Sequence, residues 1–148
     1  MHNALTTPLH ETASMVLEQM AFLCSVAVEA ELPVDAGDGI VGVDFAGPYQ
    51  GRLLVSMATG TLPTFAANMI GADEPPPEDV QRDALGELAN VICGNLLPRV
   101  TENNPVFDLS TPQSYASWEA AFGGVGERVA HVTLNMDRGR ADVVFCRN

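Results

Sequence analysis

Residues 83–95 constrain the fold more than any other stretch, because their polar side chains recur at helical spacing. An α-helix turns about 100° per residue, so steps of four, three and four return to one side. Asp83, Glu87, Asn90 and Gly94 are spaced in this way and form a narrow polar stripe. The opposite side of the same stretch is apolar and carries Leu85, Leu88, Val91, Ile92 and Leu96. The pattern predicts an amphipathic helix with one buried face.

The polar stripe has an unusual composition for a solvated helix face. No Lys or Arg occurs in 83–98, whereas an ordinary exposed face mixes acids with bases. Asn90 is a poor residue for the middle of a helix, and Gly94 costs about 1 kcal/mol relative to Ala. A bare backbone beside an amide suits the close approach of another molecule. Simpler roles stay open: Glu87 as a solvated acid, Asn90 contacting a neighbouring loop, and Asp83 favouring the helix dipole.

Composition narrows the class of protein. With 148 residues, 47% of them apolar and 18% charged, the chain is long enough and apolar enough to fold around one core. The formal net charge of −12 argues against binding to nucleic acid or to an anionic membrane surface. No membrane span or signal peptide is expected, which favours a cytoplasmic location. Cys24, Cys93 and Cys146 lack metal-ligand spacing and are expected to be reduced thiols, most of them buried.

Each half of the chain is predicted to hold one long helix, a short strand and a hairpin. In the first half we expect a helix at 11–27, strands at 31–35, 40–46 and 52–57, and a second helix at 59–70 closed by Gly71. The proline-rich segment 72–77 connects the halves. In the second half we expect a helix at 78–97, strands at 105–110, 127–136 and 140–146, and an irregular segment at 111–126 with a short helix at 115–122.

The two long helices are predicted to be equivalent. Ser14, Glu18 and Ala21 stand 69 residues before the three leading members of the polar stripe. We therefore expect an α+β fold built from duplicated helix-plus-three-strand repeats, with a six-stranded sheet packed against long helices. The chain 1–148 is expected to form a single domain whose halves are about 11–71 and 78–148.

The pattern Asp83-x-x-x-Glu87-x-x-Asn90, followed by Gly94 and Asn95, resembles the active-site signature of the CheC/CheX/FliY chemotaxis phosphatases. The resemblance implies a fold of two repeats related by a pseudo-twofold axis. It also implies hydrolysis of the phospho-aspartate on a CheY-like response-regulator receiver domain. Asn90 would hold the attacking water, Glu87 would dock on the receiver's lysine, and Asp83 would support the interface, with Gly94 leaving room for the partner.

The chemistry that this resemblance implies needs little from the protein. An aspartyl phosphate is already activated, and the receiver is expected to supply the magnesium ion, so the phosphatase needs no cofactor of its own. Its task is to orient a water molecule in line, which is worth several kcal/mol. A neutral amide suits that task, because it both donates and accepts hydrogen bonds and does not repel the phosphoryl group.

The chain departs from the family pattern at two places. Ala21 has no amide, so we expect Ser14, Glu18 and Ser25 to form no active site, and one competent site is more similar to CheX than to two-site CheC. The proline expected downstream of the Asn is also displaced: Gln113 occupies its place, and Pro112 comes one residue earlier.

Other functions stay open. The stripe of 83–94 could serve a non-catalytic module that binds a receiver or another signalling partner. The chain could also be a structural homo-oligomer, and the family resemblance implies a homodimer in any case. His2, His10 and His131 have no spacing typical of a metal site, so no metal is expected. Trp118 and Phe122 are expected to make core or dimer contacts.

Overall fold

The computed structural model describes residues 4–148. The helices are α1 (Thr6–Ala21), α2 (Thr61–Ile70), α3 (Glu78–Val100) and α4 (Trp118–Ala121). The strands are β1 (Val26–Val28), β2 (Gly39–Ala46), β3 (Gln50–Met57), β4 (Asp108–Leu109), β5 (Gln113–Tyr115), β6 (Glu127–Met136) and β7 (Gly139–Arg147). All strand pairs are antiparallel, and the strand order is β1-β6-β7-β3-β2-β4, with β5 also pairing with β2.

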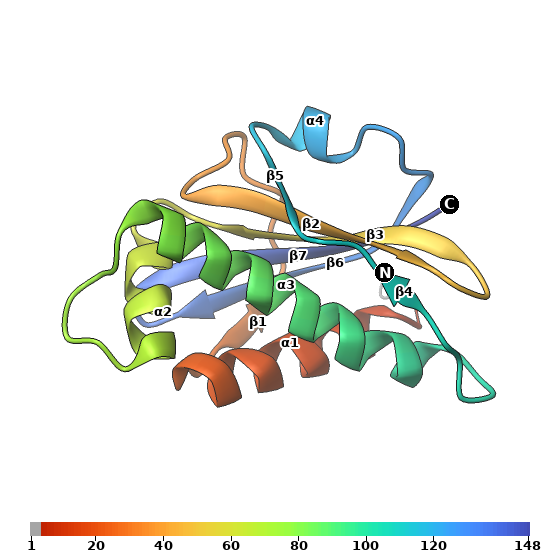
Figure 1. The fold of residues 1–148 in the computed structure, drawn as a ribbon, viewed down its shortest axis with the longest axis horizontal. Coiled ribbons are helices and arrows are strands. Elements are labelled where there is room, and N and C mark those ends of the chain that lie inside the picture. Colours follow the sequence, from red (N-terminus) through yellow and green to blue (C-terminus); the bar gives the residue numbers. More distant parts are fainter. Residues whose placement is uncertain (1–3) are drawn as a thin grey trace.

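Three helices cover one face of this sheet, and a shorter segment covers the other (Figure 1). α1, α2 and α3 pack against the sheet around a core that includes Phe65, Leu88 and Phe145. On the opposite face, α4 places Trp118 and Ala121 over the strands in a second apolar cluster. Because both faces are covered, the central strands β3 and β7 are buried along nearly their whole length.

The two predicted hairpins are confirmed. The expected strands 40–46 and 52–57 are β2 and β3, which pair along their full length. The expected strands 127–136 and 140–146 are β6 and β7, with one bulge between Arg128 and Ala130. β3 and β7 then pair with each other, Leu53 opposite Phe145, and join the two hairpins at the centre of the sheet.

The predicted helix at 11–27 is wrong at both ends. α1 begins at Thr6 and ends at Ala21, because Phe22 adopts a left-handed conformation with φ of 58° and its N–H caps the carbonyl of Glu18. Part of the expected helix is strand β1, which pairs with β6 at the edge of the sheet. The β-branched residues Val26 and Val28 favour a strand, and pairing with β6 outweighs the weak helical pattern there.

The predicted count of six strands is also wrong, since the sheet formed by residues 4–148 has seven. No strand forms at 31–35, where Pro33 lacks the N–H that a ladder needs. The strand expected at 105–110 shortens to β4, and the segment 111–126 contributes the unexpected strand β5. The short helix expected there at 115–122 is the one-turn helix α4. The longest helix starts at 78 as predicted but continues past Pro98 to Val100.

Candidate active site

Helix α3 presents the polar stripe as the sequence predicts. Asp83, Glu87 and Gly94 are exposed, and Asn90 is half-buried. Leu85, Leu88, Ile92 and Leu96 are buried against the core on the other side of the helix, and Val91 is partly buried. The amphipathic pattern therefore fixes which side of the helix faces solvent, and the four stripe residues share that side.

The connection that carries β4 and β5 runs past α3 (Figure 1), and its residues Thr111, Pro112 and Ser114 line one depression together with residues of the stripe. Two hydrogen bonds tie the connection to β2: the N–H of Ser110 donates to the carbonyl of Asp44 at 2.8 Å, and the N–H of Asp44 donates to Ser110 Oγ at 2.9 Å. Pro112 then lies against Gly86, where a Cβ would come 3.1 Å from the proline Cβ. The displaced Pro112 is thus part of the site, packed directly on the helix backbone.

A depression of about 440 Å³ lies between α3 and this connection. Asp83, Glu87 and Asn90 line it on the helix side, and Pro112 and Ser114 line it on the other. Gly94 is not part of its wall, but a Cβ there would lie 3.9 Å from Leu109 at the same side of the helix. The structure brings the predicted catalytic pair into one hollow and leaves Gly94 just beyond its end.

Asn90 is the most unusual side chain in this depression. Its Oδ1 is buried and makes no hydrogen bond with any residue of 4–148. A buried acceptor without a partner costs about 1–3 kcal/mol, and such atoms are rare in folded proteins. By contrast, Asn95 on the same helix donates its Nδ2 to the carbonyl of Val91 at 2.8 Å. The Asn90 carboxamide is half-buried without being held by the protein's own loops.

The charge around the depression is predominantly negative. Asp79, Asp83 and Glu87 contribute carboxylates, and Arg82 contributes the one cation among the lining residues. The arrangement suits a partner that presents a basic group close to the helix. Arg82 was not among the predicted site residues, although its position next to Asp83 was visible in the sequence.

The matching residues of α1 are placed differently from the stripe of α3. Ala21 is fully buried, and its carbonyl accepts a hydrogen bond from Asn68 of α2 at 3.1 Å. Glu18 is exposed, and Ser25 lies beyond the end of the helix with its Oγ 3.4 Å from the Oγ of Ser14. Ala21 thus offers neither an amide nor an exposed surface, and the absence of an active site on α1 stays a prediction.

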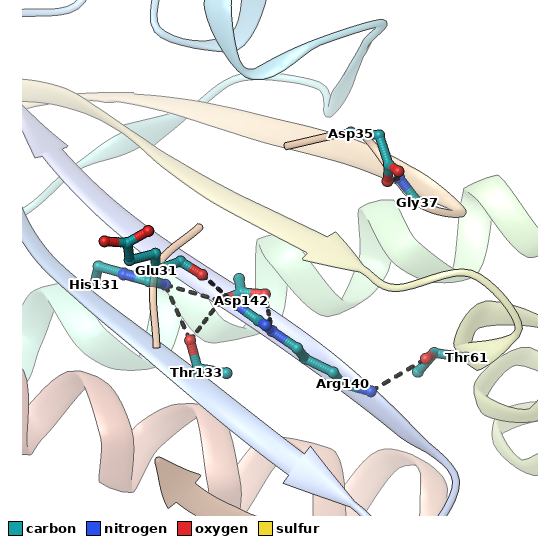
Figure 2. Close-up of polar contacts among 8 residues, drawn as sticks. All are labelled: Glu31, Asp35, Gly37, Thr61, His131, Thr133, Arg140 and Asp142. Carbon is teal, nitrogen blue, oxygen red and sulfur yellow. Dashed lines mark hydrogen bonds and ion pairs between the residues drawn. The ribbon is translucent and has the colours of Figure 1, made fainter. Parts of the chain in front are cut away.

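A separate polar cluster surrounds Asp142 on β7 (Figure 2). The carboxylate is 1% exposed and accepts hydrogen bonds from Arg140 Nε at 2.9 Å and from Thr133 Oγ1, while His131 Nε2 lies 2.8 Å away. Burial alone would raise the pKa of Asp142, but the contacts with His131, Arg140 and Thr133 outweigh it and hold the pKa below its usual range. Arg140 also donates to the carbonyl of Glu31, so the cluster ties the chain after β1 to the sheet.

The remaining sequence predictions concern the cysteines, metal binding and membrane spans. Cys24 is exposed, and Cys93 and Cys146 are buried free thiols whose pKa values burial raises to about 12 and about 11. His2 lies outside the described residues. Within the described chain, no group of three or more His, Cys, Asp or Glu side chains is placed to hold a metal ion. None of its helices has both the length and the apolar character needed to cross a membrane.

Sequence reasoning missed the walls of the depression that come from outside the helix. Thr111 and Ser114 line it because β5 pairs with β2, a long-range contact with no local signature. Gly86 carried a signal: a second glycine in the helix, next to the stripe, indicates a close approach by another part of the chain. The Asp142 cluster was also missed, although an acid inside the apolar run of 141–146 suggests a buried partner.

Several solved structures with this architecture are chemotaxis proteins. The chemotaxis protein CheX from Desulfovibrio desulfuricans matches with a TM-score of 0.75 and 20% identity over 99% of this chain and 100% of that chain. CheX from Vibrio vulnificus matches with a TM-score of 0.73 and 21% identity, covering 99% and 97%. CheX in a CheX–CheY–BeF3–Mg complex from Borrelia burgdorferi matches with a TM-score of 0.66 and 19% identity, covering 96% of both chains. At these identities the likeness defines the fold, which is that of the CheX-type proteins.

The family itself is shown by sequence. The family model of the chemotaxis phosphatase CheX matches residues 40–137, which is more than half of the chain. The chain therefore belongs to the CheX family of chemotaxis phosphatases, as the resemblance of the 83–95 stretch predicted. No curated protein matches the chain by sequence.

Proposed function

We propose that this protein is a cytoplasmic phosphatase that hydrolyses the aspartyl phosphate of a CheY-like receiver domain. The observation that carries the proposal is the Asn90 carboxamide, which lies in the depression with its buried oxygen unpartnered. Because no hydrogen bond within the described chain fixes this carboxamide, it can turn toward the depression and orient a water molecule there. Membership of the CheX family and the CheX–CheY complex solved for the Borrelia burgdorferi protein support this choice of substrate.

In the proposed reaction, Asn90 holds a water molecule in line with the scissile P–O bond. The water oxygen attacks phosphorus, and the bond between phosphorus and the aspartyl oxygen breaks. The products are a free aspartate carboxylate and inorganic phosphate, which takes up the oxygen and the protons of the water. The receiver supplies the magnesium ion that neutralises the phosphoryl oxygens. Glu87 docks on the receiver's lysine, and Asp83 and Gly94 shape the contact surface, so orientation provides most of the rate acceleration.

The test compares two asparagines on the same helix. The wild type, Asn90→Ala and Asn95→Ala are each incubated with a phosphorylated CheY-like receiver, and the loss of phosphate is followed over time. We expect Asn90→Ala to lose about 100-fold or more of the acceleration, since the water is no longer positioned. Asn95→Ala removes an amide that bonds only to its own helix and should retain activity. Full activity in Asn90→Ala would rule out the proposed mechanism.

The same assay separates catalysis from binding alone. A non-catalytic receiver-binding module would bind the activated receiver in both the wild type and Asn90→Ala, with no phosphate released by either. The acidic lining of the depression would support such binding without chemistry. Binding without turnover by the wild type would therefore select the interaction module over the phosphatase.

The fold is proposed to be a single domain of duplicated halves, about 11–71 and 78–148, related by a pseudo-twofold axis. Its support is the strand order: exchanging β1, β6 and β7 with β4, β2 and β3 reproduces the same order in reverse.

We also propose a homodimer. β1 is an edge strand whose first residue, Val26, is 67% exposed, and Phe22, four residues earlier in the chain, is 79% exposed. Light scattering coupled to size exclusion measures the mass, and a monomer at micromolar concentration would contradict the dimer.

A further inference from the structure

Five of the seven arginines of this chain pair with other residues of the same chain. The protein has seven Arg, no Lys and 19 acidic residues. Internal ion pairs or ring faces occupy Arg52, Arg99, Arg128, Arg140 and Arg147. Within residues 4–148, the side chains of two arginines make no ion pair, hydrogen bond or ring contact: Arg82, on the wall of the depression, and Arg138, on the turn between β6 and β7.

Arg82 is free although suitable acids are close in sequence. Glu78 and Asp79 precede it by four and three residues, the spacing at which helical ion pairs form. Neither carboxylate lies within 4.0 Å of its guanidinium. Such exposed helical pairs are weak, so an external carboxylate can compete for the guanidinium.

The position of Arg82 on the helix limits what it can contact. It precedes Asn90 by eight residues, which corresponds to about 12 Å along the helix axis. A group held on the phosphoryl oxygen by Asn90 is therefore beyond the reach of Arg82, and any contact is with the rim of the bound partner. Along α3 the surface is basic at Arg82, acidic at Asp83 and Glu87, and neutral at Asn90 and Gly94. A partner with the complementary order of charges can therefore bind in only one orientation.

We propose that Arg82 determines which receivers dock and in which orientation, by pairing with a carboxylate on the receiver surface about 12 Å from the phosphoryl group. This inference rests on the proposed function. The fitting partner presents a basic group to Glu87 and an acidic group to Arg82. A receiver with a lysine or arginine at the second place is rejected, because like charges face each other there. Arg82 is thus a specificity residue of the interface that does not touch the reacting atoms.

The experiment measures binding of a CheY-like receiver activated with beryllofluoride and magnesium, by titration calorimetry at low and high salt. Arg82→Glu and Arg82→Gln are compared with Arg138→Glu, which makes the same charge change as Arg82→Glu at a residue that does not line the depression. We expect Arg82→Glu to weaken binding about tenfold and Arg82→Gln about threefold at low salt, with both effects shrinking at high salt. Arg138→Glu should stay within about twofold of the wild type. Denaturant unfolding of each variant checks that the fold is retained.

Turnover distinguishes this inference from the proposed function. In Arg82→Glu we expect KM for the phosphorylated receiver to rise while kcat stays within about twofold, since a rim charge acts on association. Equal losses in Arg82→Glu and Arg138→Glu, or unchanged binding in both, would overturn the role of Arg82 and leave the phosphatase intact. Selective loss in Arg82→Glu without turnover by the wild type would support Arg82 and defeat the phosphatase. A wild type that binds no activated receiver would overturn both.

Discussion

Gly86 lies directly beneath Pro112, so that a Cβ built on the glycine would come 3.1 Å from the proline Cβ and 3.3 Å from its Cγ. The two residues belong to different elements, helix α3 and the connection between β4 and β5. Their contact places the connection against bare helix backbone and sets the width of the depression that holds Asn90. A residue that sequence reasoning treated as a displaced family proline is therefore a wall of the candidate site.

The two glycines of α3 should respond differently to the same substitution. Gly94→Ala adds a methyl group at ordinary contact distance from Leu109, so it should gain about 0.5–1 kcal/mol of stability from helix propensity. Gly86→Ala should gain less, because the new methyl group pushes against Pro112. Urea unfolding monitored by circular dichroism measures both. Equal stabilisation by the two variants would mean that Pro112 moves freely.

Asp142 is expected to make folding sensitive to acid. Its pKa is lowered in the folded protein, so its contribution is complete above the ordinary Asp value of about 3.9 and is lost as pH falls through the lower folded value. Asp142→Asn keeps the shape but breaks the buried pair with Arg140, at a cost of about 3 kcal/mol near neutral pH. Unfolding free energies between pH 7 and 2 should therefore converge for wild type and variant as the pH falls. A constant gap down to pH 2 would show that the carboxylate charge is not what stabilises the cluster.

The three thiols should differ in reactivity. Cys24 is exposed, whereas burial raises the pKa of Cys93 to about 12 and that of Cys146 to about 11. Since the thiolate is the reactive form, an aromatic disulfide reagent at pH 8 should modify one thiol rapidly in the folded protein. All three should react in denaturant. A Cys24→Ser variant that still reacts quickly with one equivalent would contradict the burial of the other two.

Trp118 should tolerate replacement better than its size suggests. Its indole is 8% exposed and stacks on Phe122, but its Nε1 is buried without a hydrogen-bond partner in the described chain. Trp118→Phe removes that unsatisfied donor while keeping an aromatic ring, so the loss of stability should be under about 1 kcal/mol. Trp118→Leu, which also removes the stacking, is the control and should cost more. A loss of about 3 kcal/mol in Trp118→Phe would indicate that the indole N–H is bonded in solution.

Local periodicity explains which parts of the fold were predictable. The stripe of α3 and the two hairpins depend on patterns in short continuous stretches of sequence. Both features were therefore placed correctly to within a few residues. The end of α1 depends on Phe22 in a left-handed conformation, which normally marks a glycine, and the sequence shows none there. β1, β4 and β5 are only two or three residues long and exist because longer strands offer them an edge.

For the candidate site too, the sequence predicted the part that lies on one helix and missed the part that comes from distant residues. Asp83, Glu87, Asn90 and Gly94 share a side because helical geometry puts them there, so their relation is local. The opposing wall and the unpaired side chain of Arg82 depend on tertiary packing, which no spacing in the sequence reveals. Whether Glu87 and Asn90 act in catalysis stays a prediction for the paired asparagine experiment.

Helix α3 is one unbroken rod of 23 residues, anchored along its apolar side in the core. All four stripe residues therefore move together with the helix. None of them lies on a hinge or flap that must move before a receiver domain can bind. In the proposed reaction, helix α3 is a fixed template. The rate of dephosphorylation then depends on how long the bound receiver domain keeps its phosphoryl group exposed to Asn90.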